Sequence, residues 1–279
     1  MTDANMITLN SGVRIPQRGF GVFQVPPTDT QRVVEQAIEI GYRHIDTAAA
    51  YNNEAGVGAA VRASGLPRAE LFVTTKLRNG EHGYESALRA YDETLRRLGL
   101  DHVDLYLVHW PNPSVDCYVE SWHALERLYA DGGVRAIGVS NFLPEHLDRL
   151  AGESDVTPAV NQIELHPSFQ QRELTKQCRD RSIAVEAYSP LGQGVDLQHP
   201  AVRTIAGRYR VTPAQVVLRW HLQLGHIVIP KSVDPERIRS NFDLDGFRMT
   251  DAEVASISAL DAGRRVGGDP RTFALSQIR

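Results

Sequence analysis

Cysteine is scarce in this chain of 279 residues, which contains only Cys117 and Cys178. The two lie far apart and form no Cys-x-x-Cys pair, so neither a disulfide framework nor a zinc site is expected, and no metal is predicted. Free thiols are typical of a reducing compartment, and we expect a cytoplasmic protein. The opening MTDANMITLN has no basic stretch followed by an apolar core, so no signal peptide is expected.

Long hydrophobic runs and excess positive charge are missing as well. No apolar stretch approaches the ~20 residues of a membrane-spanning helix. The formal net charge is −4 at pH 7, which argues against a basic field for nucleic acid or an anionic membrane. Neither G-x-G-x-x-G nor G-x-x-x-x-G-K-[ST] occurs, so a Rossmann dinucleotide domain and a P-loop are disfavoured. The expected partner is a small molecule rather than a nucleic acid or a membrane.

What the chain does contain is a regular alternation of strand-like and helix-like segments. A hairpin is predicted at ITLNSGVRIP, with Asn10-Ser11-Gly12 as its turn. Strands are predicted at 18–22, 43–46, 71–76, 103–109, 136–140, 159–163, 184–188 and 227–229. Helices are predicted at 28–40, 54–63, 85–98, 118–129, 173–180, 213–223 and 251–260, with two more beginning at Pro144 and Pro235. Eight strand–helix units predict a (β/α)₈ TIM barrel that uses residues 1–279 as one domain.

Polar side chains stand at the ends of three consecutive predicted strands. Asp46 ends the second strand, Lys76 the third and His109 the fourth. Active sites of such barrels lie at the carboxyl ends of the strands, and a polar last position on an apolar face is hard to explain by packing. Tyr51 follows Asp46 on a loop of small residues in GYRHIDTAAAYNNE (41–54). A strand-end aspartate is usually a cap and a loop tyrosine usually packs, so only the four residues together indicate a site.

These four residue types suit hydride delivery to a carbonyl, because the developing alkoxide needs a proton donor. A tyrosine with an ordinary pKa of about 10 is a reluctant donor, and a neighbouring Lys76 ammonium is expected to lower the pKa of Tyr51. Asp46 is expected to keep the buried Lys76 protonated. His109 is expected to donate a hydrogen bond to the carbonyl oxygen.

The segment IPKSVDPERIRSN (229–241) follows the last predicted strand, where barrels commonly bind phosphate. Lys231, Ser232, Arg237 and Asn241 offer charge and hydrogen bonds, and a helix beginning at Pro235 adds the positive end of its dipole. The other interpretation is a basic surface turn with a helix cap, and the segment alone does not decide between the two.

Taken together, these segments resemble the aldo-keto reductase superfamily. The resemblance is strongest to its bacterial branch that contains the 2,5-diketo-D-gluconate reductases. It implies NADPH-dependent reduction of a small-molecule aldehyde or ketone by a monomeric (β/α)₈ barrel with a C-terminal tail over the active-site face. The motifs that carry it run in order along nearly the whole chain: GFGVFQ (19–24), GYRHIDTAAAYNNE (41–54), TTKL (74–77), VDLYLVHWP (103–111), IGVSNF (137–142), NQIELHP (161–167), YSPLGQG (188–194) and IPKSVDPERIRSN (229–241).

The resemblance also implies roles for individual residues. The catalytic tetrad, with Tyr51 as general acid, matches Asp46, Tyr51, Lys76 and His109. The nicotinamide is held by Ser140, Asn141 and Gln162, with Tyr188 stacked on its ring. The pyrophosphate is covered by Ser189, Leu191 and Gln193. The family's binding sites for the adenosine 2′-phosphate and the adenine match Lys231, Ser232, Val233, Arg237 and Asn241. Further cofactor contacts match Gly21, Val22, Phe23 and Asp46, and the substrate is contacted by Phe23, Tyr51, Arg78, His109 and Trp110.

Two departures from the superfamily's pattern bear on specificity. Arg78 stands where many relatives have a tryptophan wall of the substrate pocket, so it either reads an anion on the substrate or reaches into solvent. Ser240 stands where many have a glutamate before the adenine-binding asparagine, which bears on cofactor release. Lys231 and Arg237 predict NADPH over NADH, with Asp234 opposing the preference locally.

Two other functions compete with this interpretation. A Schiff-base aldolase on the same barrel would use Lys76 as its nucleophile, but it needs a neutral amine, whereas Asp46 and Tyr51 favour a charged one. A cofactor-binding regulatory subunit, like the potassium-channel β-subunits of the same superfamily, would not need a complete tetrad.

Overall fold

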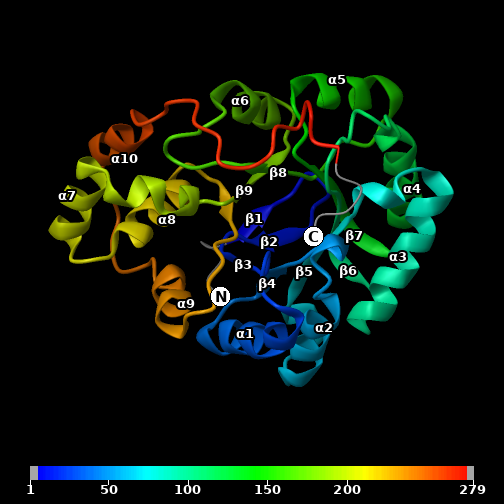
Figure 1. Cartoon of the computed structure of the whole chain (residues 1–279), viewed down its shortest axis with the longest axis horizontal. Coiled ribbons are helices and arrows are strands. Elements are labelled where there is room, and N and C mark those ends of the chain that lie inside the picture. Colours follow the sequence, from blue (N-terminus) through cyan, green and yellow to red (C-terminus); the bar gives the residue numbers. More distant parts are fainter. Residues whose placement is uncertain (1–5, 275–279) are drawn as a thin grey trace.

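The computed structural model describes residues 6–274, in which eight parallel strands form a barrel (Figure 1). Its neighbouring strands follow the chain in order from β3 to β10. A parallel bridge between Arg18 and Val228 brings the first and last strands together, which confirms the predicted (β/α)₈ barrel. The strands are β3 (Gly19–Gly21), β4 (His44–Asp46), β5 (Phe72–Leu77), β6 (Val103–Val108), β7 (Val134–Ser140), β8 (Val160–Glu164), β9 (Ala184–Tyr188) and β10 (Ile227–Val228).

Helices surround the barrel on its outer side (Figure 1). They are α1 (Pro27–Ile40), α2 (Glu54–Ala63), α3 (Tyr84–Leu98), α4 (Tyr118–Ala130), α5 (Pro144–Glu153), α6 (Arg172–Asp180), α7 (Pro200–Tyr209), α8 (Pro213–Gln223), α9 (Pro235–Phe242) and α10 (Asp251–Ser258). Short 3₁₀ turns are η2 (Ala49–Tyr51), η3 (Arg68–Glu70), η4 (Asn79–Glu81) and η5 (Gly192–Gln198). Helix α7 is the one long element outside the predicted set. Its signals are present, since Pro200 opens it and Val202, Ile205 and Ala206 lie on its buried face, but eight strand–helix units are complete without it.

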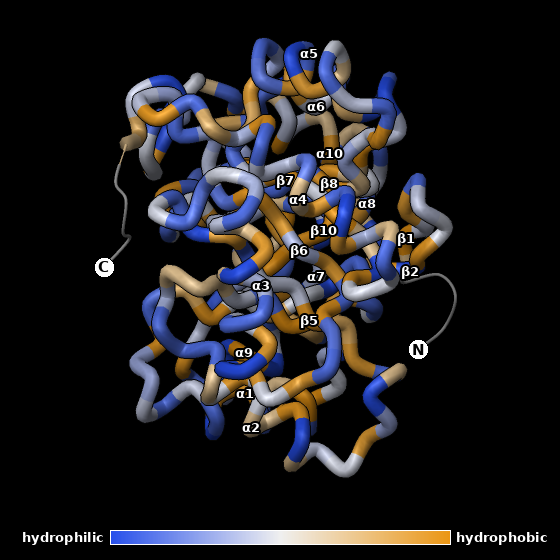
Figure 2. Tube along the Cα trace, turned by 90° about the vertical axis from the view of Figure 1, so that its right-hand side faces the viewer, coloured by the Kyte–Doolittle hydropathy of each residue, from blue (hydrophilic) through white to orange (hydrophobic). Residues whose placement is uncertain are grey.

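The strands divide the apolar residues between two cores. Outward residues such as Ile45, Val73 and Tyr106 pack against the helices in the larger core. Inward residues near the amino ends of the strands form a smaller core that includes Phe72 and Leu105. Apolar residues accordingly concentrate on the inner parts of the fold in Figure 2, with hydrophilic segments around them.

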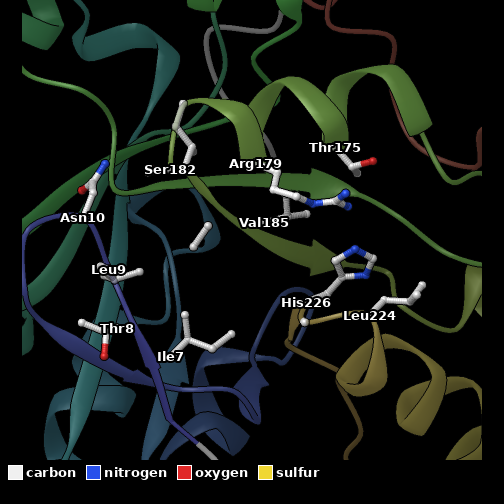
Figure 3. A pocket seen from close by; sticks show the side chains of 13 residues that line it. Ile7, Thr8, Leu9, Asn10, Thr175, Arg179, Ser182, Val185, Leu224 and His226 are labelled. Atoms are coloured by element: carbon white, nitrogen blue, oxygen red, sulfur yellow. The ribbon is translucent and has the colours of Figure 1, made fainter.

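The predicted N-terminal hairpin closes the amino end of the barrel. Strands β1 (Met6–Thr8) and β2 (Arg14–Pro16) pair antiparallel, and their turn is closed by a bond from Leu9 N to Val13 O of 2.8 Å. Leu9 and Ile15 belong to the inner core. Beside the hairpin, a cavity of about 300 Å³ opens between β1, α6 and the turn before β10 (Figure 3). It lies at the end of the barrel away from the polar strand ends.

The C-terminal segment crosses the opposite, carboxyl end of the barrel, as predicted (Figure 1). The amides of Val266 and Gly267 donate to the Glu164 carboxylate at 2.6 and 2.8 Å. His166 lies between Glu164 and Asp196, with its ring nitrogens 3.1 Å from each. We call Glu164, His166 and Asp196 the tail clamp, because they join β8, the loop at η5 and the tail.

Candidate active site

The barrel register brings the four predicted catalytic residues together. Asp46 ends β4, Lys76 lies near the end of β5, and His109 follows β6 directly. Tyr51 is delivered by the 3₁₀ turn η2, whose small residues permit a tight path. The Asn53 side chain fixes this turn, since it accepts from Thr47 Oγ1 at 2.8 Å and donates to Val22 O at 2.9 Å.

Lys76 is fully buried and forms an ion pair with Asp46. Its Nζ donates to both Asp46 oxygens at 2.7 and 2.8 Å and to Thr47 O at 2.8 Å. Burial, the largest single influence, would lower the pKa of Lys76, but Asp46 first, and then Tyr51 and Glu186, together hold the pKa above its ordinary value. Lys76 is therefore an ammonium, which suits electrostatic stabilisation and disfavours the neutral amine that a Schiff-base aldolase requires.

Tyr51 lies with its hydroxyl 3.5 Å from Nζ of Lys76. Its ring packs between Phe23 and His109, at centroid distances of 5.1 and 5.6 Å. Burial raises the pKa of Tyr51 above its ordinary value; Lys76 lowers it in the predicted direction, but less strongly. Tyr51 consequently remains protonated at neutral pH, which is the state that a proton donor needs.

His109 is buried and neutral. Burial first, and then the charge of Lys76, hold its pKa well below the ordinary value. Its Nδ1 has no hydrogen-bond partner among residues 6–274. A neutral imidazole has one N–H to donate, so His109 can position a carbonyl oxygen without competing with Tyr51 as the acid.

The residues predicted to hold the nicotinamide form one hydrogen-bonded cluster beside the tetrad. Ser140 Oγ donates to Gln162 O at 2.9 Å, and Gln162 Nε2 donates to Asp46 Oδ2 at 2.8 Å. Asn141 Nδ2 donates to His109 O at 3.0 Å, and Tyr188 OH donates to Asn141 Oδ1 at 2.8 Å. The amide and hydroxyl groups that would meet a carboxamide are thus already oriented by their neighbours.

Several predicted cofactor residues have an unusual backbone. Asn141, Ser189 and Gln193 have φ angles of 63°, 46° and 53°. A side chain disfavours this left-handed region, and such residues cluster at functional sites. Gly192 also has positive φ, and a Cβ there would lie 2.8 Å from Asp196 Oδ2. Leu191, beside it, packs partly buried against the core.

The predicted adenosine end lies at the start of α9. Asp234 caps this helix by accepting from Arg237 N at 2.9 Å, and Ser232 Oγ accepts from Asp234 N at 3.1 Å. The negative charge of Asp234 therefore offsets part of the positive end of the helix dipole, which was expected to attract a phosphate. The Arg237 side chain is 75% exposed. Lys231 and Val233 are exposed as well, while Asn241 is buried.

The remaining predicted contacts surround the mouth of the barrel. Phe23 is exposed beside Tyr51, and Trp110 is buried with its Nε1 lacking a partner among residues 6–274. Gly21 allows close approach of the residue that follows β10, because a Cβ there would lie 2.9 Å from Ile229 O. The Val22 side chain faces the outer core, so only its backbone is available to a cofactor.

The Arg78 side chain is paired with a nearby carboxylate. It donates to Glu81 at 2.7 Å, and about a third of each side chain is exposed. The guanidinium is thereby held at the rim of the site by a residue three positions further along the chain.

Two residues at the site were not singled out from the sequence. Phe273 of the tail stacks on Trp110 with a centroid distance of 3.9 Å and an angle of 18° between the rings. Glu186 lies fully buried in β9. An aromatic residue in a polar tail and an acid in the apolar run AVEAY were the available signals. Within residues 6–274, no group of three His, Cys, Asp or Glu residues could hold a metal ion, and no helix is long and apolar enough to cross a membrane.

Comparison with known proteins identifies what the chain resembles. A sequence model described as "Aldo/keto reductase family" matches residues 18–262. A protein named morphine 6-dehydrogenase from Pseudomonas putida is 50% identical, over 98% of this chain and 97% of its own. A protein named methylglyoxal reductase DkgA from Yersinia pestis is 48% identical, over 98% of this chain and 99% of its own length. A crystal structure of a Gox0644 mutant in complex with NADPH is 46% identical, with a TM-score of 0.92, over 96% of this chain and 98% of that one.

Proposed function

The chain belongs to the aldo/keto reductase family and catalyses NADPH-dependent reduction of a carbonyl to an alcohol, and we propose that Tyr51 donates the proton in this reaction. The observation that carries the proposal is the position of the Tyr51 hydroxyl, 3.5 Å from a buried ammonium that both oxygens of Asp46 hold in place.

The proposed mechanism divides the reaction between cofactor and protein. When bound, NADPH supplies a hydride to the carbonyl carbon. Tyr51 gives its hydroxyl proton to the carbonyl oxygen, and Lys76 stabilises the phenolate that remains until solvent returns the proton. Asp46 keeps Lys76 charged, and the neutral His109 donates a hydrogen bond to the carbonyl oxygen.

The described residues fit NADPH along the rim from β7 to α9. Ser140, Asn141 and Gln162 present preoriented polar groups for the carboxamide, and Tyr188 offers an aromatic surface. Lys231 and Arg237 offer exposed cations for the 2′-phosphate, so we propose a preference for NADPH over NADH. Asp234 lies 3.9 Å from Nε of Arg237, and we expect its charge to reduce that preference.

The substrate is a small-molecule carbonyl compound. We propose that Arg78 favours substrates with an anion near the carbonyl, which would replace Glu81 as the partner of the guanidinium. We also propose that the protein acts as a monomer, because its exposed large apolar side chains lie on separate elements, among them Phe23, Tyr84 and Leu224. The free thiols of Cys117 and Cys178 support a cytoplasmic location.

Replacement of Tyr51 by phenylalanine tests the proton donor. We expect Tyr51→Phe to lower kcat by about 10²–10⁴-fold while NADPH binding, followed by quenching of protein fluorescence, changes little. Tyr106→Phe is the matched control, because the Tyr106 hydroxyl is buried without a hydrogen-bond partner in the described chain and faces the outer core. Wild-type turnover in Tyr51→Phe would remove Tyr51 from the mechanism.

A further inference from the structure

Glu186 lies in the middle of β9, and its side chain points into the barrel below the candidate active site. The strand's period of two puts Glu186 on the same face as Tyr188. Its strand neighbours in register are Gln162 of β8 and Ile227 of β10. Across the barrel, its Oε1 lies 3.6 Å from Nε2 of His44 on β4. The side chain is fully buried.

The Glu186 carboxyl group lacks the partners that an ionised carboxylate needs. Neither oxygen has a hydrogen-bond partner among residues 6–274. The nearest donors are already committed elsewhere. The Lys76 ammonium is directed at Asp46, Thr47 and Tyr51, and the Gln162 amide donates to Asp46 at 2.8 Å. A buried carboxylate without hydrogen bonds is strongly unfavourable, so this geometry favours the neutral acid.

Of the titratable groups that face Glu186, one is neutral, one repels a negative charge and one attracts it. His44 of β4 is neutral, because burial lowers its pKa to about 3. Asp46 of β4 repels a second negative charge, and Lys76 of β5 attracts one. Burial first, and then Asp46, raise the pKa of Glu186 to about 8, with the Lys76 charge and the nearby Gln162 amide opposing them. The neighbouring strands β8 and β10 contribute only the neutral Gln162 and Ile227 at this level.

We propose that Glu186 is a positioning residue that keeps its own proton while Tyr51 donates, and that loss of the Glu186 proton slows carbonyl reduction. With Glu186 and His44 neutral, the charges that remain beside Glu186 are the Lys76 ammonium and the Asp46 carboxylate, which cancel each other. Ionised Glu186 adds an uncompensated negative charge. Tyr51 must develop a negative charge in the same interior when it gives up its proton, and Glu186 raises the pKa of Tyr51. Tyr51 is then a weaker acid.

The proposal rests on the role of Tyr51 as proton donor, and its first test is a pH profile of hydride transfer. The rate of NADPH oxidation would be measured in a single turnover at saturating cofactor and carbonyl substrate, between pH 6 and pH 9.5. We expect the wild-type rate to fall by about three- to tenfold with a midpoint near pH 8. Glu186→Gln, which cannot ionise, should lose this step and remain within about twofold of wild type at pH 6.5.

Two further variants separate this effect from a general disturbance of the barrel. Glu186→Asp keeps an ionisable carboxyl and should retain a step at a shifted midpoint. Glu54→Gln is the matched control, because Glu54 is equally buried but its carboxylate is held by Thr75 and Arg97 on the outer side of the barrel. It should leave the profile unchanged. An unchanged step in Glu186→Gln, or its loss in Glu54→Gln, overturns the proposal.

An independent readout does not depend on catalysis. A protonated carboxylic acid has an infrared C=O absorption distinct from that of a carboxylate, so the wild-type protein at pH 7 should show a buried-acid band that disappears near pH 8. Glu186→Gln should lack this band. Absence of the band in the wild type at pH 7 also overturns the proposal. If Tyr51→Phe kept wild-type turnover while the band titrated as expected, the proton donor would be wrong and the protonation of Glu186 would stand.

Discussion

The molecule contains two buried clusters of charge at the carboxyl end of the barrel, and they are built in opposite ways. The Lys76–Asp46 pair joins two neighbouring strands, and its remaining bonds end on Thr47 and Gln162, which follow or belong to strands. The tail clamp instead forms hydrogen bonds with segments outside the sheet. Glu164 accepts from the tail amides of Val266 and Gly267, and Asp196 accepts from Ser168 N at 3.3 Å.

The Lys76–Asp46 pair and the tail clamp therefore have different roles. In the Lys76–Asp46 pair the barrel fixes the charges, so the charges are available for chemistry. In the tail clamp the charges fix the covering segments, so they are not. We therefore expect substitutions in the pair to remove activity, and substitutions in the clamp to loosen the covering segments while the chemistry continues.

The largest effect is expected from Lys76→Met. It should lower kcat by about 10³-fold, because Tyr51 loses the ammonium that stabilises its phenolate. It should also lower the free energy of unfolding by about 3–5 kcal/mol, because Asp46 remains as an unpaired buried carboxylate. Denaturant unfolding and NADPH turnover measure the two effects.

A double variant distinguishes the two effects of this substitution. Asp46→Asn together with Lys76→Met removes both charges and should regain most of the lost stability without regaining activity. Recovery of activity in the double variant would contradict a catalytic role for the Lys76 charge.

The difference between the two clusters also shows which parts of the site could be predicted from the sequence. The pair was predictable, because strand ends and the period of two placed Asp46 and Lys76 at one rim. The clamp was not, because Glu164 and its partners Val266 and Gly267 are about 100 residues apart and the tail has no periodic pattern. Phe273 escaped prediction for the same reason. Glu186 lay on an inward face that the period of two defines, but a single acid in a strand gives no sign of whether it has partners.

An intermediate effect is expected from His166→Asn in the tail clamp. Burial alone would lower the pKa of His166, but the hydrogen bonds that its ring donates to the Asp196 and Glu164 carboxylates hold the pKa above the ordinary 6.5. Its contribution to stability is therefore complete below pH 6.5 and is lost as the pH rises through the folded-state pKa. We expect the variant to lose about 2 kcal/mol of unfolding free energy at pH 6 and less at pH 9, with faster hydrogen exchange at Val266 and Gly267.

His146→Asn is the matched control for this prediction. Burial lowers the pKa of His146, so a neutral ring is favoured in the folded state and its contribution grows as the pH rises toward 6.5. The stability loss in this variant should accordingly have the opposite pH dependence. Equal losses at pH 6 and pH 9 in His166→Asn would show that the clamp is held by packing alone.

The smallest effect is expected at Arg78, which belongs to neither cluster. Arg78→Trp should raise KM for an anionic ketone and lower KM for an aromatic aldehyde, each by about two- to fivefold, because an exposed charge contact is worth little. Initial rates with the two substrates measure this, and Arg89→Trp on the exposed side of α3 is the control. A shift of both KM values in one direction would show that Arg78 does not respond to substrate charge.

We expect the stacking of Phe273 on Trp110 to compete with any aromatic substrate that contacts the Trp110 ring. Such a substrate must first displace a ring tethered to the same chain, which acts at a high effective concentration. Its apparent affinity is reduced by the fraction of molecules in which Phe273 occupies that surface. A small aliphatic carbonyl that reaches Tyr51 without touching Trp110 avoids this competition. We therefore expect substitution of Phe273 to change which carbonyl compounds are reduced without any change in the barrel.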